Sequence, residues 1–204
     1  MKAVKPAKST LIWLALTLAV TVPIAVAARS PLLAWREPVY IAAGFAGVFA
    51  MALLLVQPLL AGGYLPGLPA RRGRRVHRIV GAGLVLAVIV HVAGLWITSP
   101  PDVIDVLLFR SPTPFSLWGV IAMWGVFAAA FLSLVRRRLG VRVWRIAHTS
   151  VVGIVVATSA VHAILIQGTM GTVSKTVLCV LAIVATGKVI IDLKAWKHLL
   201  RKRG

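Results

Sequence analysis

The sequence predicts an all-α integral membrane protein, a six-helix transmembrane bundle with both termini in the cytoplasm. Three observations support this fold class. The 204 residues have a mean hydropathy of +0.96, and only 13% of them are charged, about half the fraction in an ordinary soluble domain. The apolar residues gather in six long stretches, and the basic residues gather in alternate connections between them.

Each apolar stretch is bounded by charged residues, Pro or Gly and is long enough to cross a hydrocarbon core of about 30 Å. Within one domain covering residues 1–204, the spans are expected at 11–28, 39–61, 76–98, 115–135, 141–167 and 173–191. The first span also resembles a signal peptide, with a basic start and Ala25-Val26-Ala27 near its end. Cleavage there would leave five spans, whereas retention gives six.

The basic residues predict the orientation. Of the 23 Lys and Arg, only Arg29, Arg36, Arg110 and Lys175 fall on one side of the predicted spans. The others fall on the opposite side: Lys2, Lys5, Lys8, Arg71, Arg72, Arg74, Arg75, Arg78, Arg136, Arg137, Arg138, Arg142, Arg145, Lys188, Lys194, Lys197, Arg201, Lys202 and Arg203. Because Lys and Arg accumulate on the cytoplasmic side, we expect a multi-pass protein of the bacterial inner membrane. The net charge of +19 then reflects topology first and contact with anionic lipid second, and no nucleic-acid partner is expected.

Four of the five histidines lie inside predicted spans, where ionisable residues are costly and usually functional. His77 and His91 stand at positions i and i+14 of the third span, and His148 and His162 repeat that spacing in the fifth. This spacing falls about 40° short of four full helical turns and corresponds to a rise of about 21 Å. Both members of each pair therefore share one face of their helix, at two depths in the bilayer.

The third and fifth spans run in the same direction, so His77 is expected beside His148 and His91 beside His162. Two layers of paired imidazoles match the axial ligation of two six-coordinate b-type haems. The alternatives are core histidines that bond neighbouring helices and a di-metal site. The single cysteine, Cys179, makes an internal disulfide or a cysteine-ligated cluster impossible and is expected to be a buried apolar residue.

Several neighbours of the histidines fit a haem site. Glycines close to the histidines in sequence would let a porphyrin approach the backbone, or would simply allow close helix packing; they are Gly81, Gly83, Gly94 and Gly153. Arginines suit carboxylates, so propionate partners are expected among Arg74, Arg75, Arg78 and Arg145 for the inner haem and at Arg110 for the outer one. His198, in the basic tail, is expected at the surface. Residues 99–114 are expected to form a solvated Pro-rich linker, or else a segment that covers the outer haem or docks an acceptor.

These residues resemble the ferric reductase-like transmembrane domain family. The starts Arg74-Arg75-Val76-His77-Arg78 and Trp144-Arg145-Ile146-Ala147-His148 are similar to that family's two haem helices. The family includes ferric reductases, NADPH oxidases and the haem-binding subunit of the periplasmic methionine-sulfoxide reductase system. The resemblance covers about residues 40–190. It implies that His77 and His148 ligate an inner haem b, that His91 and His162 ligate an outer haem b, and that electrons pass from the first to the second.

The expected function is therefore electron transfer across the membrane, from a cytoplasmic flavoprotein reductase or quinol to a periplasmic ferric chelate or redox protein. No Gly-rich dinucleotide fingerprint follows a strand, so flavin or nicotinamide chemistry is expected from another polypeptide. Two alternatives remain open, namely a haem-binding anchor that docks a separate periplasmic oxidoreductase and a haem-free scaffold or channel. The presence of haem and the neighbouring genes would separate the three.

Overall fold

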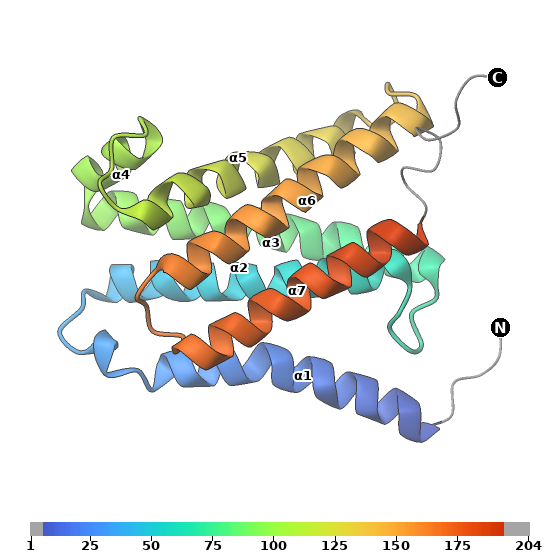
Figure 1. Cartoon of the computed structure of the whole chain (residues 1–204), viewed down its shortest axis with the longest axis horizontal. Coiled ribbons are helices and arrows are strands. Elements are labelled where there is room, and N and C mark those ends of the chain that lie inside the picture. Colours follow the sequence, from blue (N-terminus) through green and yellow to red (C-terminus); the bar gives the residue numbers. More distant parts are fainter. Residues whose placement is uncertain (1–5, 194–204) are drawn as a thin grey trace.

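The computed structural model describes residues 6–193, and that part of the chain is helical throughout, with seven α-helices (Figure 1). Their bounds are α1 Pro6–Ala28, α2 Pro38–Gly62, α3 Ala70–Thr98, α4 Pro100–Leu107, α5 Pro114–Val135, α6 Val141–Leu165 and α7 Thr172–Asp192. All but α4 are long and apolar enough to span a membrane. The prediction of six spanning helices in an all-α protein is therefore confirmed for the described residues.

Several predicted features fall outside the described residues. They are Lys2 and Lys5 before the first helix and Lys194, Lys197, His198, Arg201, Lys202 and Arg203 after the last.

Proline and glycine set most of the helix boundaries. Proline occupies the first turn of α2, α4 and α5, where its missing N–H costs no helical hydrogen bond. The helix α2 ends at Gly63, whose left-handed φ of 69° lets its N–H reach the carbonyls of Leu59 and Leu60. The boundaries of α2 and α5 lie within a few residues of the predicted ones, because the same residues delimit the apolar stretches in the sequence.

The start of α3 differs from the prediction. The apolar stretch was expected to begin at residue 76, but the helix begins at Ala70, so the arginines from Arg71 to Arg75 lie on a helix and not in a loop. Arginine is a good helix former, and a helix continues beyond the apolar layer where its side chains reach water. The first turns also pack closely on α2, since a Cβ on Gly73 would lie 2.6 Å from the Leu60 carbonyl oxygen.

The helices form two antiparallel hairpins held together by α7. The tightest packing is between α2 and α3 and between α5 and α6, and α7 packs on both α2 and α6. The helix α1 lies outside, against α2 and α7, and α3 meets α5 on the other side (Figure 1). The histidine-bearing helices α3 and α6 make little direct backbone contact with each other. The space between them is therefore bordered by helices from both hairpins.

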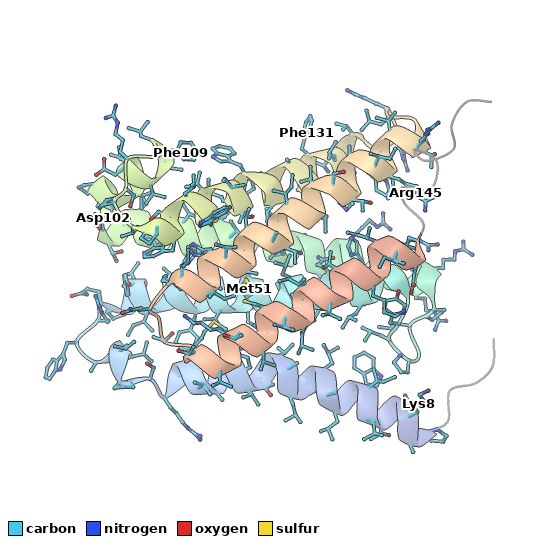
Figure 2. The ribbon with its side chains drawn as sticks, in the orientation of Figure 1. Lys8, Met51, Asp102, Phe109, Phe131 and Arg145 are labelled. Carbon is cyan, nitrogen blue, oxygen red and sulfur yellow. The ribbon has the colours of Figure 1, made fainter. Side chains whose placement is uncertain are left out.

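The apolar core runs along α2, α6 and α7. Leu54, Val155 and Leu178 are buried in its main cluster. Met51, near the centre of Figure 2, also contacts a second cluster formed by Ala160, Ala163 and Cys179. Cys179 is buried, as the sequence predicted. Small side chains at this contact let α6 and α7 approach closely.

The two ends of the bundle differ in charge. One end, called the basic end here, holds Lys8 and the arginine-rich turns that begin α3 and α6; the opposite end holds Asp102 and Phe109 (Figure 2). The chain enters α1 and leaves α7 at the basic end (Figure 1). An even number of antiparallel spans requires this arrangement.

The connection from Ser99 to Thr113 contains α4, so it is more ordered than a Pro-rich linker. Pro100 begins this helix, the Ser99 hydroxyl donates to the Asp102 carboxylate at 2.5 Å, and Val103 is buried. The helix is too short to register as an apolar span, which explains why span prediction missed it. It packs on both α3 and α5 and joins the two hairpins at the opposite end.

Replacing Gly94 by alanine tests the packing of α2 on α3. A Cβ at Gly94 would lie 2.7 Å from the Ala43 Cβ and 3.3 Å from the Val39 carbonyl oxygen. We expect Gly94→Ala to lower the free energy of unfolding by about 1–3 kcal/mol, measured by denaturant unfolding in detergent. The control is Gly44→Ala, where an added Cβ meets nothing within 4 Å; it should leave stability unchanged or raise it. Equal effects of the two substitutions would contradict the observed packing.

Candidate functional site

The structure brings the four intramembrane histidines together in the predicted pairs. His77 and His91 lie on α3 and His148 and His162 on α6, and all four side chains are half-buried. His91 is close enough to His162 to interact electrostatically, and His148 is close enough to His77. The first pair lies toward the opposite end and the second toward the basic end. Along each helix the two layers are about 21 Å apart.

Three of the imidazoles are held by backbone carbonyls of the helix that precedes theirs in the hairpin. Nδ1 of His91 donates to the Ala43 carbonyl of α2 at 2.7 Å, and Nδ1 of His77 lies 3.1 Å from the Gln57 carbonyl of the same helix. In the second hairpin, Nδ1 of His162 donates to the Phe115 carbonyl of α5 at 2.9 Å. Each hydrogen bond joins the two helices of one hairpin and fixes the direction of a ring.

These hydrogen bonds decide which ring nitrogen is available. A carbonyl oxygen only accepts hydrogen bonds, so Nδ1 of His91 and of His162 carries the proton. Nδ1 of His77 also faces the side-chain amide of Gln57. A neutral imidazole then has its lone pair on Nε2, at the far side of the ring from the supporting helix. Metal-ligating histidines are typically held in this way, with the second nitrogen donating to a carbonyl or carboxylate.

Two glycines make room for the rings of the pair at the opposite end. A Cβ at Gly47 would lie 3.0 Å from Nδ1 of His91, and a Cβ at Gly119 would lie 2.7 Å from Nδ1 of His162. Each glycine stands at position i+4, about one helical turn, after the residue whose carbonyl accepts. Any larger side chain at either position would meet the imidazole.

The two hairpins therefore repeat one arrangement. The accepting residues of α2, Ala43 and Gln57, have the same spacing as the two histidines of α3, as the antiparallel pairing of the helices requires. Gly119 follows Gly47 in the chain by the same interval that separates Phe115 from Ala43. The sequence showed no repeat beyond the histidines. Gly47 and Gly119 do not stand out in the sequence, because α2 also contains Gly44 and α5 also contains Gly125.

His148 departs from this pattern. Ala129 occupies the position equivalent to Gln57, and its carbonyl lies near His148, but among residues 6–193 Nδ1 of His148 has no hydrogen-bond partner of normal geometry. Its ring is instead stacked on Trp144, with ring centroids 5.5 Å apart and planes inclined by 16°. Nε1 of Trp144 is likewise buried and has no partner in the described part of the chain. The histidine layer at the basic end therefore has two differently supported rings.

The predicted propionate arginines do not all lie together. Arg74, Arg75 and Arg78 of α3 line a cavity of about 260 Å³ at the basic end, with Arg71 and Arg136. Arg145 does not line this cavity, and its Nη2 donates to the Leu193 carbonyl at the end of α7 at 2.9 Å. Arg110 is exposed in the turn after α4, at the opposite end.

The glycines singled out from the sequence mostly serve helix packing. Gly81 faces the buried amide of Gln57, Gly83 faces Leu53, and Gly94 meets Ala43, so all three face α2. Of these four glycines, Gly153 on α6 is the one whose added Cβ would meet nothing within 4 Å in the described part of the chain. Of the two explanations offered for these glycines, packing accounts for the three in α3, and open space beside the backbone remains only at Gly153.

The lysine at the opposite end supports the helix that carries His162. Lys175 of α7 is only 8% exposed, and its Nζ donates to the carbonyls of Ile164 and Ile166 at 3.0 and 2.6 Å. These carbonyls belong to the last residues of α6, where the helical hydrogen bonds end. In the sequence alone, Lys175 contributes only to the prediction of the membrane orientation, and this contact was not predicted.

Replacing Lys175 by methionine tests this support. The change keeps an unbranched apolar stem and leaves the carbonyls of Ile164 and Ile166 without their charged donor, so we expect the free energy of unfolding to fall by about 1–3 kcal/mol. Lys188→Met on the same helix is the matched control, since Lys188 lies at the surface, where it pairs with the exposed Asp192 and lies over the Tyr64 ring. Chemical unfolding followed by tryptophan fluorescence measures both. If the two variants are equally stable, Lys175 does not support the end of α6.

The chemistry of the site follows from its donor set. Among residues 6–193, no three His, Cys, Asp or Glu side chains come together as a metal-ion site would need. Each layer offers only two imidazole nitrogens, one from α3 and one from α6. A pair of imidazoles suits a metal whose other ligands come from a cofactor, as in a porphyrin with two axial ligands.

Comparison with known proteins places this geometry in a family. Residues 43–161 match the family described as ferric reductase like transmembrane component. The match begins at Ala43, the partner of His91, and ends at the residue before His162. No curated protein and no solved structure matches the chain. The matched region covers more than half of the 204 residues, and the described chain has six helices suited to spanning a membrane. The chain therefore belongs to the ferric reductase-like transmembrane component family, a membrane family related to oxidoreductases.

Proposed function

We propose that this protein is a b-type dihaem membrane cytochrome that transfers electrons from a cytoplasmic donor to a periplasmic acceptor. Membership of the ferric reductase-like family supports membrane electron transfer, and members of this family typically bind haem. The proposed axial ligands are His77 and His148 for an inner haem and His91 and His162 for an outer haem.

The orientation of the imidazoles carries this proposal. The rings of His91 and His162 use Nδ1 to hold a backbone carbonyl, so their unprotonated Nε2 atoms are available as ligands. The two helices that bear the four histidines make little contact with each other. A core histidine that only joined helices would not need a partner histidine facing it at each of two depths.

The charge distribution supports the proposed direction of transfer. We place the basic end in the cytoplasm of a bacterial inner membrane, because Lys and Arg accumulate on that side. The pair His77 and His148 then lies near the donor, and the pair His91 and His162 lies near the acceptor. The two histidine layers are about 21 Å apart along the helices. They would divide electron transfer across the bilayer into shorter steps.

The arginines nearest the inner pair suit haem propionates. Guanidinium groups bind carboxylates with two parallel hydrogen bonds. The cavity at the basic end is lined by Arg74, Arg75 and Arg78, among others. In the observed rotamer Arg145 caps α7 instead. At the outer haem, Arg110 remains the proposed partner.

Bound haem would supply one-electron redox chemistry, and His77 with His148 and His91 with His162 would hold the two haems. With two histidines at each site, the chain would offer no further side chain there to bind a substrate, so we propose electron transfer to the acceptor without direct bonding. The proposed acceptor is a ferric chelate or a periplasmic redox protein, and the proposed donor is a cytoplasmic flavoprotein reductase or a quinol. The exposed surface around α4 is the part of the opposite end best placed to meet an acceptor.

Single histidine variants test the ligand assignment. We expect His77→Ala, His91→Ala, His148→Ala and His162→Ala each to reduce the haem content of purified protein from two per chain to about one, because one axial ligand of one site is lost. His198→Ala, in the basic tail outside the described residues, is the matched control and should retain both haems. Pyridine haemochrome absorbance against protein concentration measures the ratio.

The haem content of these variants distinguishes the proposed function from its two alternatives. Two haems per chain in all four intramembrane variants would contradict the assignment. Protein that never contains haem would favour a scaffold or channel, whereas haem that is present but cannot be oxidised by any external acceptor would favour an anchor for another oxidoreductase.

Replacing Gly119 by alanine tests the role of the carbonyl support. The added Cβ would lie 2.7 Å from Nδ1 of His162, so the ring must shift and weaken its hydrogen bond to the Phe115 carbonyl. Loss of this bond lowers the electron donation of the imidazole, so we expect the midpoint potential of one haem to rise and its binding to weaken about 10- to 100-fold. Potentiometric titration measures the change. Gly187→Ala, with nothing within 4 Å, should leave both potentials unchanged.

A further inference from the structure

The cavity at the basic end is lined by five arginines and has a volume of about 260 Å³. Four of them, Arg71, Arg74, Arg75 and Arg78, stand at positions i, i+3, i+4 and i+7 of α3 and therefore share one face of that helix. The fifth, Arg136, caps the end of α5. All five are exposed, so the cavity opens at the surface where α3 and α5 meet.

Within residues 6–193, no carboxylate lies beside this cluster of positive charge to balance it. The chain has four acidic residues, and Glu37, Asp102 and Asp105 lie at the opposite end. At the basic end, Asp192 accepts a hydrogen bond from Tyr64 and pairs with Lys188 at 2.7 Å. Burial and the hydrogen bond to Asp192 raise the pKa of the Tyr64 hydroxyl, so it stays a donor to that carboxylate.

Four like charges on one helix face repel one another, and their position makes the repulsion worse. Neighbouring cations at i and i+4 destabilise a helix, and the first turns of a helix already carry the positive end of its dipole. Arg72, on another face of the same turns, does not line the cavity. A bound anion would therefore stabilise this row of four arginines on one face of α3.

We propose that this cavity binds the phosphate of an anionic phospholipid headgroup. The spanning helices reach the membrane surface at this level, and guanidinium groups bind phosphate oxygens in pairs. The cavity holds roughly nine water volumes of about 30 Å³, enough for a phosphate group but less than the roughly 300 Å³ or more of a typical site for a drug-sized ligand. Two haem propionates would also leave some of the five cations unbalanced, so the lipid site does not depend on haem.

The test compares two double variants that remove the same charge at the same end of the bundle. Arg71→Gln with Arg136→Gln removes two cavity arginines from two helices, and neither is a proposed propionate partner. Arg72→Gln with Arg137→Gln removes two arginines that do not line the cavity. Each protein is reconstituted in phosphatidylcholine nanodiscs, and the association of spin-labelled phosphatidylglycerol and phosphatidylcholine is compared by electron paramagnetic resonance.

We expect the native protein to prefer phosphatidylglycerol and the cavity variant to lose about five-fold or more of that preference for each arginine removed. The variant outside the cavity should keep most of it, and both should keep their haem content. Arg71→Lys with Arg136→Lys, which preserves the charge but not the planar fork, should show an intermediate preference and guards against misfolding of the glutamine variant.

Three results would overturn the proposal. Equal losses in both double variants would show that diffuse surface charge attracts the lipid. Binding of inorganic pyrophosphate that depends on Arg71 and Arg136, without any preference for phosphatidylglycerol, would make the cavity a site for soluble phosphates. Haem loss confined to the cavity variant, with unchanged lipid preference, would assign the cavity to propionates.

Discussion

The hydrogen bond from a histidine Nδ1 to a carbonyl of the neighbouring helix is the interaction on which the arrangement of the site depends. An imidazole inside a membrane must find a partner, because an unsatisfied polar group in hydrocarbon costs several kcal/mol. His91, His77 and His162 find theirs on the backbone of α2 or α5. That bond joins the helices of a hairpin, fixes the tautomer and directs Nε2 away from the supporting helix. One contact thus serves both stability and the availability of a ligand.

The repeated hairpin explains how a small bundle holds two similar sites. Antiparallel pairing makes two carbonyls of α2 face two histidines of α3 that have the same spacing along the chain. In the second hairpin, Phe115 and Gly119 repeat the roles of Ala43 and Gly47. The symmetry fails at His148, where stacking on Trp144 replaces a normal hydrogen bond. A less strongly polarised ligand there would give the inner and outer sites different potentials, a difference that directional transfer can use.

Much of this arrangement was predictable because hydropathy and helical phase are local properties. The six spans and the pairing of His77 with His148 and of His91 with His162 needed only segment lengths, an antiparallel order and the pitch of an α-helix. The extension of α3 to Ala70 was missed because the apolar stretch stops at the arginines, whereas the helix continues through them. The helix α4 was missed because a short segment that begins with two prolines carries no span signal.

Contacts between helices were not predictable from one sequence. Gly94 and Gly153 look alike in the chain, yet one packs against Ala43 and the other meets nothing within 4 Å. Nothing near Ala43 or Phe115 in sequence indicates that their carbonyls support histidines 48 and 47 residues away. Lys175, counted only as a charge on one side of the membrane, supports the end of α6 because the fold brings α7 beside it.

The most direct measurement of the central claim is the haem content of the purified native protein, combined with a redox titration of its absorbance. Two bis-histidine sites predict two b-type haems per chain and two one-electron steps with distinct midpoint potentials. A single haem per chain, or no haem in protein expressed with sufficient iron and haem precursor, would contradict the account.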